Sequence, residues 1–163
     1  MHHNREESIE KLRELITGID FCMLTTIDEG HLRSRPMSTQ EFEFDGDLWF
    51  FTSDNTHKMS EIANDPRVNV AYAQPSNNQY VSVSGRAEMV KDRPKIEELW
   101  SPILKAWFPE GLDDPHLCLM KVSVEQAEYW DTPSGKILQI IGFVKALATG
   151  QEASYGDNEK ISF

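Results

Sequence analysis

Hydrophobic and polar residues alternate along most of this chain, in short runs separated by turn residues. Because successive side chains of a strand point to opposite faces, alternation of this kind predicts β-strands with one buried face. The first two runs flank a DEG turn and the next two flank a DGD turn, so we expect two hairpins there. The alternating runs are 21–27, 31–39, 41–44, 48–52, 67–74, 79–90 and 116–131.

Three other segments have apolar residues three and four positions apart, which predicts amphipathic helices. The first covers about 5–17, and Asn4 with Glu7 matches the pattern that caps a helix start. The second covers 56–64 and ends before an Asp-Pro pair. The third begins after Asp92, which is suited to cap it.

The last part of the chain has a weaker pattern. We interpret 136–150 as a strand followed by a short helix, and we expect the polar tail at about 150–163 to be loosely ordered at best. Six or seven strands at hairpin spacing with three helices predict a mainly β, antiparallel barrel with helices packed outside. A length of 163 residues fits one domain, 1–163.

Composition narrows the function classes. The chain has 16 basic and 27 acidic residues, a net charge of −11, and no Lys/Arg-rich run, which argues against nucleic-acid binding. No 18-residue apolar run or apolar N-terminal signal is present, so we expect a cytoplasmic protein without membrane contact. Cys22 and Cys118 each lie in an apolar run. One disulfide would be compatible with two cysteines, but buried free thiols in a reducing compartment are favoured.

Common catalytic and ligand motifs are absent from the sequence, including GxGxxG, GxxxxGK[ST], GxSxG, CxxC and HExxH. His57 and Glu61 are four apart on an expected helix, but two residues do not make a metal site, so no metal is predicted.

A basic cluster is the strongest chemical signal. Arg33 and Arg35 lie in a stretch without acids, and Lys58 lies in the first turn of a helix whose N-cap is Thr56 or Asn55. A lysine at that position opposes the helix dipole, whereas a bound phosphate would be stabilised by both the lysine and the free N–H groups.

The basic cluster also has a purely structural interpretation. Lys58 would then be solvated, and Arg35 would pair with Glu41 or Asp54. Composition alone leaves both interpretations open.

Three segments in this order and spacing resemble the flavin-binding half of pyridoxamine 5′-phosphate oxidase-like proteins: GHLRSRPMS, LWFFTSDNTHKMSEIANDPRVNVAY and VSVSGRAE. The later AEYWD with TPSGK, and the ending NEK, are similar to the general stress group of that family. The resemblance runs from about residue 6 to the end. It implies a split β-barrel of about six strands with flanking helices, and a homodimer with FMN (or FAD) bound at the interface.

The resemblance also implies roles for individual residues. An arginine and a Ser/Thr-x-Lys clamp would hold the flavin phosphate, the residues after the arginine and a threonine would line the ring, and a tryptophan of the partner subunit would close the site. The matching residues here are Arg35, Pro36, Met37, Ser38, Thr52, Thr56, His57, Lys58 and Trp130. Trp130 as a core or interface residue without flavin contact is an equal alternative.

The chain departs from the true oxidases at several positions. Gln40 replaces the lysine for the substrate phosphate, and Tyr80 falls where a glutamine is usual, although Gln79 is adjacent. An arginine–histidine pair near the C-terminus is also missing. The departures imply that pyridoxamine phosphate is not the substrate.

Several functions stay open at this point. The chain is expected to be an FMN-dependent oxidoreductase with a nicotinamide donor, or else a non-catalytic flavin-binding stress protein or sensor. Relatives of the fold use deazaflavin or haem instead, and His31, His57 and His116 are available as axial haem ligands.

Overall fold

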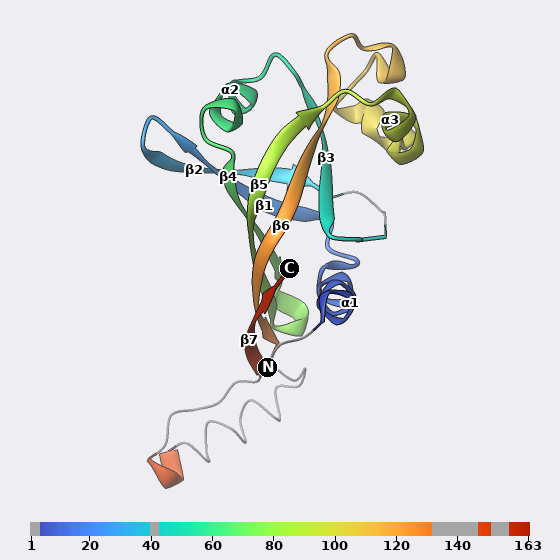
Figure 1. Cartoon of the computed structure of the whole chain (residues 1–163). Coiled ribbons are helices and arrows are strands. Elements are labelled where there is room, and N and C mark those ends of the chain that lie inside the picture. The colour runs from blue at the N-terminus through green and yellow to red at the C-terminus, as the bar shows by residue number, and fades with distance from the viewer. Residues whose placement is uncertain (1–3, 40–42, 132–146, 151–156) are drawn as a thin grey trace.

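The computed structural model describes residues 4–39, 43–131, 147–150 and 157–163. Its centre is an antiparallel seven-stranded sheet with the order β2-β1-β4-β5-β6-β3, and β7 pairs with β6 beside this path. The sheet curls into an open half-barrel (Figure 1), which confirms the split-barrel expectation. The strands are β1 (Phe21–Asp28), β2 (His31–Ser38), β3 (Asp47–Ser53), β4 (Arg67–Gln74), β5 (Gln79–Val90), β6 (Leu117–Asp131) and β7 (Asp157–Ser162).

Helices cover the two ends of the half-barrel. In Figure 1, α2 lies near the end of β2 and α3 lies beside β3, whereas α1 lies toward the opposite end of the sheet. The helices are α1 (Arg5–Ile16), α2 (His57–Asn64) and α3 (Arg93–Leu99), with 3₁₀ turns η1 (Pro75–Asn77), η2 (Pro102–Ala106) and η3 (Gly111–Asp113). None of the helices in the described part of the chain is long and apolar enough to cross a bilayer.

Local sequence signals position these elements as predicted. The Asn4 side chain accepts a hydrogen bond from the Glu7 backbone N–H while the Glu7 side chain accepts one from Asn4, a complete capping box. The helix ends before Gly18, whose φ of 83° lies in the left-handed region. The Asp92 side chain caps α3 by accepting from the Lys95 N–H.

The first hairpin is also confirmed. β1 and β2 pair over their whole length, from Phe21 opposite Ser38 to Asp28 opposite His31. The two residues between the strands, Glu29 and Gly30, both have positive φ, as a tight type I′ turn requires.

The second predicted hairpin is wrong. Glu43 and Phe44 are outside any strand, residues 40–42 lie outside the described part, and β3 pairs with β6 instead. Phe44 is 1% exposed and packs in the core rather than in a ladder. β3 is apolar on both faces, since Leu48 and Phe50 join the main core while Phe51 joins a second cluster, so a short local partner could not cover it.

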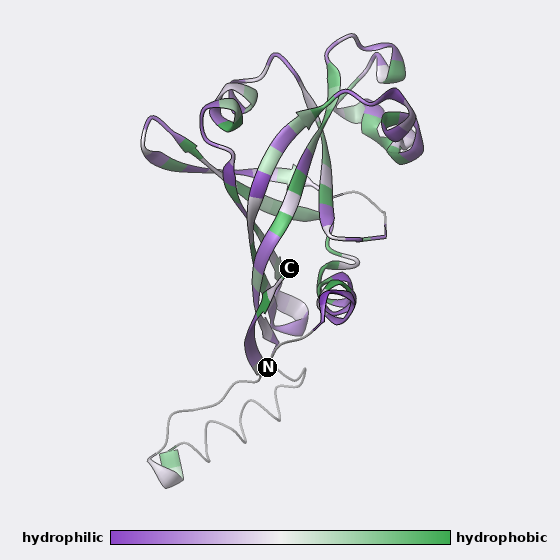
Figure 2. Ribbon diagram, in the orientation of Figure 1, coloured by the Kyte–Doolittle hydropathy of each residue, from purple (hydrophilic) through white to green (hydrophobic). Residues whose placement is uncertain are grey.

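The alternating pattern produces two cores on opposite faces of the sheet. Strands show alternating hydrophobic and hydrophilic bands in Figure 2. The larger core fills the half-barrel beneath α1 and α2, and the smaller one lies between β3, β6 and α3. Cys22 and Cys118 are both free and buried in the larger core.

The tail prediction needs correction as well. Its last residues form β7, which pairs with β6 from Asp157 opposite Asp131 to Ser162 opposite Gln126. Ile161 is 3% exposed, and the Phe163 ring meets the Phe44 ring edge-on at 6.1 Å. Two apolar side chains therefore anchor a strand whose composition is otherwise polar. The predicted strand and helix at 136–150 lie largely outside the described residues, apart from a helical turn at 147–149.

Candidate functional site

Strand β2 presents a basic face toward helix α2. Met37, Arg35 and Arg33 share the inner face of β2. They pair with three residues of β1, namely Cys22, Leu24 and Thr26 in that order. The alternation puts Pro36 and Ser38 on the other face. Because α2 packs against β1, its first turn and its buried face come within reach of this basic row.

Glu61 of α2 is the partner of both arginines. Its side chain is 2% exposed, and its Oε2 accepts a hydrogen bond from Arg35 Nη2 at 2.8 Å. Its Oε1 accepts one from Arg33 Nη1 at 2.8 Å. The Thr26 hydroxyl donates to Glu61 Oε2 and accepts from Arg35 Nη2 at 2.6 Å. The buried Glu61 carboxylate thus fixes the orientation of the Arg35 guanidinium.

Two buried polar atoms near this cluster have no partner. Within the described residues, neither Arg35 Nη1 nor Thr52 Oγ1 makes a hydrogen bond, although both atoms are inaccessible to solvent. Buried donors in proteins almost always have a hydrogen-bond partner. Two buried donors without one therefore mark a place where a ligand group or water belongs. Thr52 lies opposite Cys118 on the inner face of β3 and β6.

Lys58 adds a third donor to the same region. Its Nζ lies 3.7 Å from Met37 Sδ, and among the described residues no carboxylate oxygen lies within 4.0 Å of it. Burial lowers the pKa of Lys58 from its ordinary value, and the neighbouring Arg35 charge lowers it further. The charge of Glu61 acts in the opposite direction and raises that pKa, but no carboxylate contacts the amine directly.

The start of α2 faces the same region with its backbone. Thr56 is the N-cap, and its hydroxyl donates to the Ser53 carbonyl oxygen at 3.1 Å instead of capping the helix. No acidic residue lies in the first turn. The free N–H groups and the positive end of the helix dipole therefore have no acidic side chain of the first turn to pair with.

His57 is oriented differently from its neighbours Thr56 and Lys58. Its side chain is 67% exposed, and its Nε2 lies 3.5 Å from Asp28 Oδ1 and 3.7 Å from Glu61 Oε1. The three side chains have the donor types of a metal site. However, Arg33 Nη1 already bonds to Glu61 and lies 3.3 Å from Asp28 Oδ2, so a guanidinium holds the position a cation would take.

The sequence-predicted structural partners of Arg35 are not those observed. Asp54 pairs with Lys91 and, at 2.8 Å, with His116 Nδ1, which lowers the Asp54 pKa from its ordinary value. Glu41 lies outside the described residues.

The two cysteines near the site are buried and protonated. Burial raises the Cys22 pKa to about 12 and the Cys118 pKa to about 11. Thiols with such pKa values are poor nucleophiles, so neither is a candidate for covalent catalysis.

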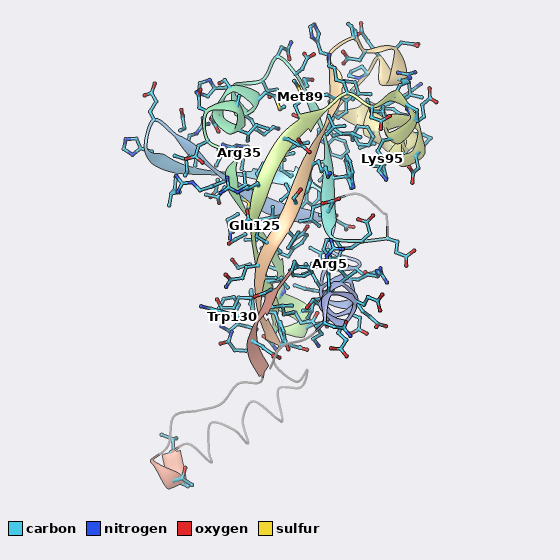
Figure 3. All side chains as sticks on the ribbon, viewed as in Figure 1. Arg5, Arg35, Met89, Lys95, Glu125 and Trp130 are labelled. Carbon is cyan, nitrogen blue, oxygen red and sulfur yellow. The ribbon has the colours of Figure 1, made fainter. Side chains whose placement is uncertain are left out.

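Trp130 lies far from the basic cluster within one chain. It is on β6 opposite Tyr80 and is 41% exposed. Thr52 pairs with Cys118, which lies on β6 twelve residues before Trp130. At about 3.3 Å per residue, Cys118 and Trp130 are about 40 Å apart along the strand. Figure 3 shows Trp130 near the lower end of the sheet and Arg35 well above it, at the side where β2 lies. A single chain therefore does not bring Trp130 to the predicted site.

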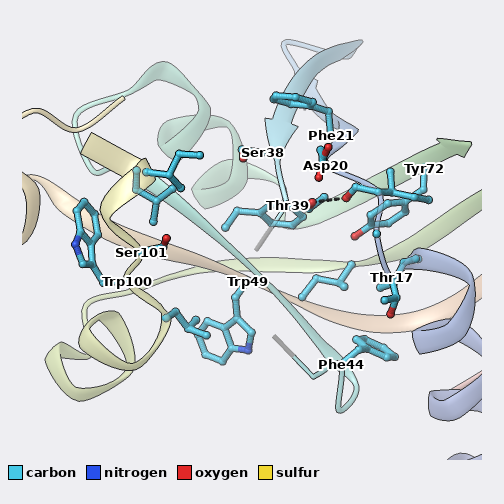
Figure 4. Close-up of a pocket in the computed structure, with 18 of the residues that line it drawn as sticks. Thr17, Asp20, Phe21, Ser38, Thr39, Phe44, Trp49, Tyr72, Trp100 and Ser101 are labelled. Carbon is cyan, nitrogen blue, oxygen red and sulfur yellow. Dashed lines mark hydrogen bonds between the residues drawn. The ribbon is translucent and has the colours of Figure 1, made fainter. Parts of the chain in front are cut away.

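A groove opens where β2 ends. Figure 4 shows it between the start of β1, the end of β2 and strand β3, with Trp49 and Trp100 along one wall. Its volume is about 1090 Å³, and Ser38 and Thr39 line it at the point where β2 ends. Ser38 lies on the face of β2 opposite to Met37, and none of the lining residues belongs to the basic cluster.

Sequence reasoning missed Glu61 and Thr26. Glu61 is notable in the sequence only for its spacing of four from His57, and its pairing with the arginines is not predicted. Its partners come from β1 and β2, 26 to 35 residues away, so only the packing of α2 on the sheet shows the pairing.

Comparison with known proteins agrees with this architecture. The family model described as "Pyridoxamine 5′-phosphate oxidase like" matches residues 7–154. The chain belongs to the pyridoxamine 5′-phosphate oxidase-like family. Within this family the similarity is to general stress proteins: General stress protein 26 of Bacillus subtilis is 29% identical over 126 residues, which cover 75% of this chain and 87% of the relative.

Two solved structures support the same family placement. A protein of Jannaschia sp. CCS1 described as a general stress protein 26 superposes with a TM-score of 0.75 at 25% identity, covering 98% of this chain and 100% of the other. The general stress FMN/FAD binding protein of Xanthomonas citri superposes with a TM-score of 0.68 at 28% identity, covering 80% and 92%.

Proposed function

We propose that this protein binds FMN, with the phosphate held by Arg35, Lys58 and the first turn of α2, and with Thr52 donating to the flavin ring. The observation that carries the proposal is Arg35 Nη1, a buried donor without a partner among the described residues, together with the partly buried Lys58 amine, whose contact is the Met37 thioether rather than a carboxylate. A phosphate dianion offers acceptor oxygens and negative charge to both of them at once.

The residues present fit such a group chemically. Glu61 already neutralises the inner side of the arginine pair, so one phosphate would balance the remaining positive charge of Lys58 and the helix end. When bound, the flavin would supply two-electron redox chemistry, and the protein would bind, orient and shield it. Thr52 would act as a hydrogen-bond donor, and Met37 would provide an apolar contact beside Lys58.

FMN is preferred over the other ligands of this fold for two reasons. The Xanthomonas relative is described as an FMN/FAD binding protein, and the phosphate donors of this chain suit FMN or the inner phosphate of FAD. Haem would need an axial histidine, and in the described part of the chain none of the residues lining the groove is a histidine. His57 is turned toward Asp28.

In a homodimer with two sites, Trp130 of one subunit would be able to reach the flavin site of the other. Since this residue is exposed and remote from Arg35 in its own chain, it could close the site only of a second copy. The outer face of β1 and β2 supplies an apolar patch for such a dimer, with Phe21, Met23 and Leu32 all exposed.

Oxidation of pyridoxamine phosphate is not the activity we propose. Gln79 is engaged with Asp131 at 3.3 Å, and Tyr80 lies beside it on an exposed strand end. Gln40, where the true oxidases have lysine, is a residue the structure does not describe. In place of that reaction we propose a flavin-dependent oxidoreductase with a nicotinamide donor, active in the cytoplasm.

A non-catalytic flavin-binding protein is the second candidate, because Lys58, the amine of the cluster whose pKa is lowered, is assigned to the phosphate rather than to acid–base catalysis. Reduction of the loaded protein by NADH or NADPH separates the two. Rapid bleaching of the flavin absorbance supports the enzyme, and an unchanged spectrum under excess donor supports the binder.

The test of the site is an FMN titration followed by flavin fluorescence. Saturable quenching at micromolar concentration is expected for the wild type. The double variant Arg35→Ala/Lys58→Ala should bind more weakly by about 3–6 kcal/mol, at about 1.5–3 for each charged hydrogen bond. Arg86→Ala, on an exposed surface pair with Glu125, is the matched control. Equal affinity of the double variant and the wild type would exclude this phosphate site.

A further inference from the structure

The chain reaches α2 through a short turn that follows β3. β3 ends at Ser53, and only Asp54 and Asn55 lie between it and Thr56, the N-cap of α2. The Ser53 carbonyl oxygen accepts a hydrogen bond from the Thr56 hydroxyl at 3.1 Å and one from the Thr56 N–H at 3.4 Å. The direction in which the first turn of α2 leaves the sheet is therefore set within these few residues.

Asp54 ties this turn to the start of β6. Its backbone N–H donates to the His116 carbonyl oxygen at 2.9 Å, which continues the β3–β6 ladder one step beyond the pair of Ser53 and Leu117. Its carboxylate Oδ1 lies 2.8 Å from Nδ1 of the same histidine. The His116 N–H in turn donates to Asp114 Oδ1 at 2.9 Å. The backbone and the side chain of Asp54 thus both bind His116.

The other carboxylate oxygen of Asp54 reaches the end of β5. Lys91 directly follows Val90, the last residue of β5, and its Nζ forms an ion pair with Asp54 Oδ2. The same amine donates to the Pro115 carbonyl oxygen at 3.3 Å. Figure 1 shows the ends of β3 and β5 and the start of β6 at the same end of the half-barrel as α2. One carboxylate therefore joins three strand ends next to the start of α2.

Asp54, Lys91 and His116 form a charged network, which we call the Asp54 clamp. The hydrogen bonds from Lys91 and His116 lower the Asp54 pKa, so the carboxylate is ionised at neutral pH. Burial is the main cause of the raised Cys118 pKa, but the Asp54 charge raises it further, whereas the Lys91 and Lys58 charges lower it. The Asp54 clamp and the Lys58 amine are therefore both within electrostatic range of one buried thiol.

The other end of α2 has an ion pair of a more local kind. Asp65 is the C-cap, and its two carboxylate oxygens accept from Arg67 Nε at 2.9 Å and from Arg67 Nη2 at 2.6 Å. The two residues are close neighbours in the chain and lie eight residues or more from Thr56. This pair can stabilise the end of the helix, but it does not fix where the first turn begins.

We infer that Asp54 is a positioning residue for an anion bound at the start of α2. Through Lys91 and His116 it holds the turn at 54–56, and this turn sets the place of the Lys58 amine and of the free N–H groups. Donors that are held in place before binding lose less freedom when the anion arrives. The fixed turn does not depend on any ligand, whereas its consequence for FMN rests on the proposed function.

A double variant removes the Asp54 clamp without changing the net charge. Asp54→Ala/Lys91→Met loses one acid and one base, so the overall attraction of the region for an anion stays nearly the same. Asp65→Ala/Arg67→Met is the matched control, because it removes an ion pair of the same kind at the other end of α2. Both pairs lie at the surface, so each double variant should remain folded, which circular dichroism checks.

Amide hydrogen exchange tests the turn in the free protein. Exchange of the segment 54–60 should be about fivefold faster or more in the clamp variant than in the wild type, and unchanged in the control variant. The Met59 N–H, which donates to the Thr56 carbonyl oxygen at 3.1 Å, reports on the first turn itself. Equal exchange in the clamp variant and the wild type would overturn the inference.

Two flavins test the consequence for binding. FMN and riboflavin share the ring system and differ in the phosphate, so a misplaced phosphate site weakens the binding of FMN alone. The clamp variant should bind FMN about fivefold more weakly or worse, and riboflavin as the wild type does. Lys91→Arg keeps the ion pair and should bind FMN like the wild type. Equal weakening of both flavins would indicate a general structural loss and overturn the positioning role.

Failure of the proposed function would give a different result. If the wild type binds neither flavin while exchange at 54–60 is faster in the clamp variant, the proposed cofactor is contradicted and the positioning of the turn is supported. If the wild type and the clamp variant bind FMN with equal affinity, the cofactor is retained and the inference is overturned.

Discussion

The Glu61 carboxylate lies 2.8 Å from Arg35 Nη2 and holds that guanidinium against the Thr26 hydroxyl. This contact uses one side of the guanidinium and leaves Nη1, on the other side, without a partner in the described part of the chain. A buried carboxylate beneath an arginine thus does two things. It compensates the charge of the arginine in the absence of ligand, and it fixes the direction in which the free donor points.

Replacing this carboxylate tests the first of these roles. Glu61→Gln keeps the shape of the side chain and removes its charge, which leaves Arg35 uncompensated and Arg33 with Asp28 as its remaining acid. We expect a loss of about 2–4 kcal/mol in the free energy of unfolding, measured by urea denaturation; Arg33 is half exposed, so the loss should be smaller than for a fully buried network. Glu125→Gln, on an exposed pair with Arg86, should change stability by less than about 0.5 kcal/mol. Equal effects of the two variants would contradict this account.

The unpaired hydroxyl of Thr52 gives a second prediction. Thr52→Val removes a buried donor that has no partner, so stability should stay the same or rise by up to about 1 kcal/mol. FMN affinity should fall by about 0.5–1.5 kcal/mol, since the hydroxyl would donate to the bound flavin. Thr26→Val is the control for the opposite case: its hydroxyl is fully bonded, so its loss should destabilise the protein. Destabilisation by Thr52→Val would mean that its hydroxyl is satisfied in the free protein.

The pH dependence of FMN binding gives a third prediction. Because burial and Arg35 lower the Lys58 pKa, the amine loses its proton at a lower pH than an ordinary lysine. The positive charge that attracts the phosphate is present below that pKa and is lost as pH rises through it, so affinity should decline on the alkaline side before the usual lysine range. Lys58→Arg keeps its charge at all these pH values and should show no such decline. Superimposable profiles would show that Lys58 does not contact the phosphate.

How far the sequence predicts this molecule depends on the range of each interaction. The helix α1, with its Asn4 and Glu7 cap, and the β1–β2 hairpin follow from neighbours in the chain, and both were predictable. The pairing of β3 with β6 joins Asp47 to Ser123, and no local pattern encodes a partner so distant. The basic cluster of Arg33, Arg35 and Lys58 stands out in the charge pattern of the sequence, but its pairing with the Glu61 carboxylate does not, because α2 meets β2 only in the folded chain.

The tail illustrates the opposite error, since a polar composition concealed a strand. β7 has one fully buried side chain, Ile161, and is followed by the half-buried Phe163. Ile161→Ala should therefore lower the free energy of unfolding by about 2–4 kcal/mol, in the range measured for buried aliphatic truncations. Met89→Ala, at a position 49% exposed, is the comparison and should cost less than about 1 kcal/mol. A small effect of Ile161→Ala would mean that β7 is dispensable for the core.

The distant partner of β3 has a consequence for how the molecule assembles. Until β6 is in place, the segment from Leu48 to Phe51 is an unpaired apolar strand with three consecutive aromatic side chains. Strands that are far apart in the sequence pair slowly during folding. Apolar strands that are still unpaired can associate with other chains in that time. We therefore expect refolding yield to fall steeply as chain concentration rises, and chaperones that shield exposed strands to recover most of it. The same strand that later forms a wall of the groove is the main aggregation risk during biogenesis.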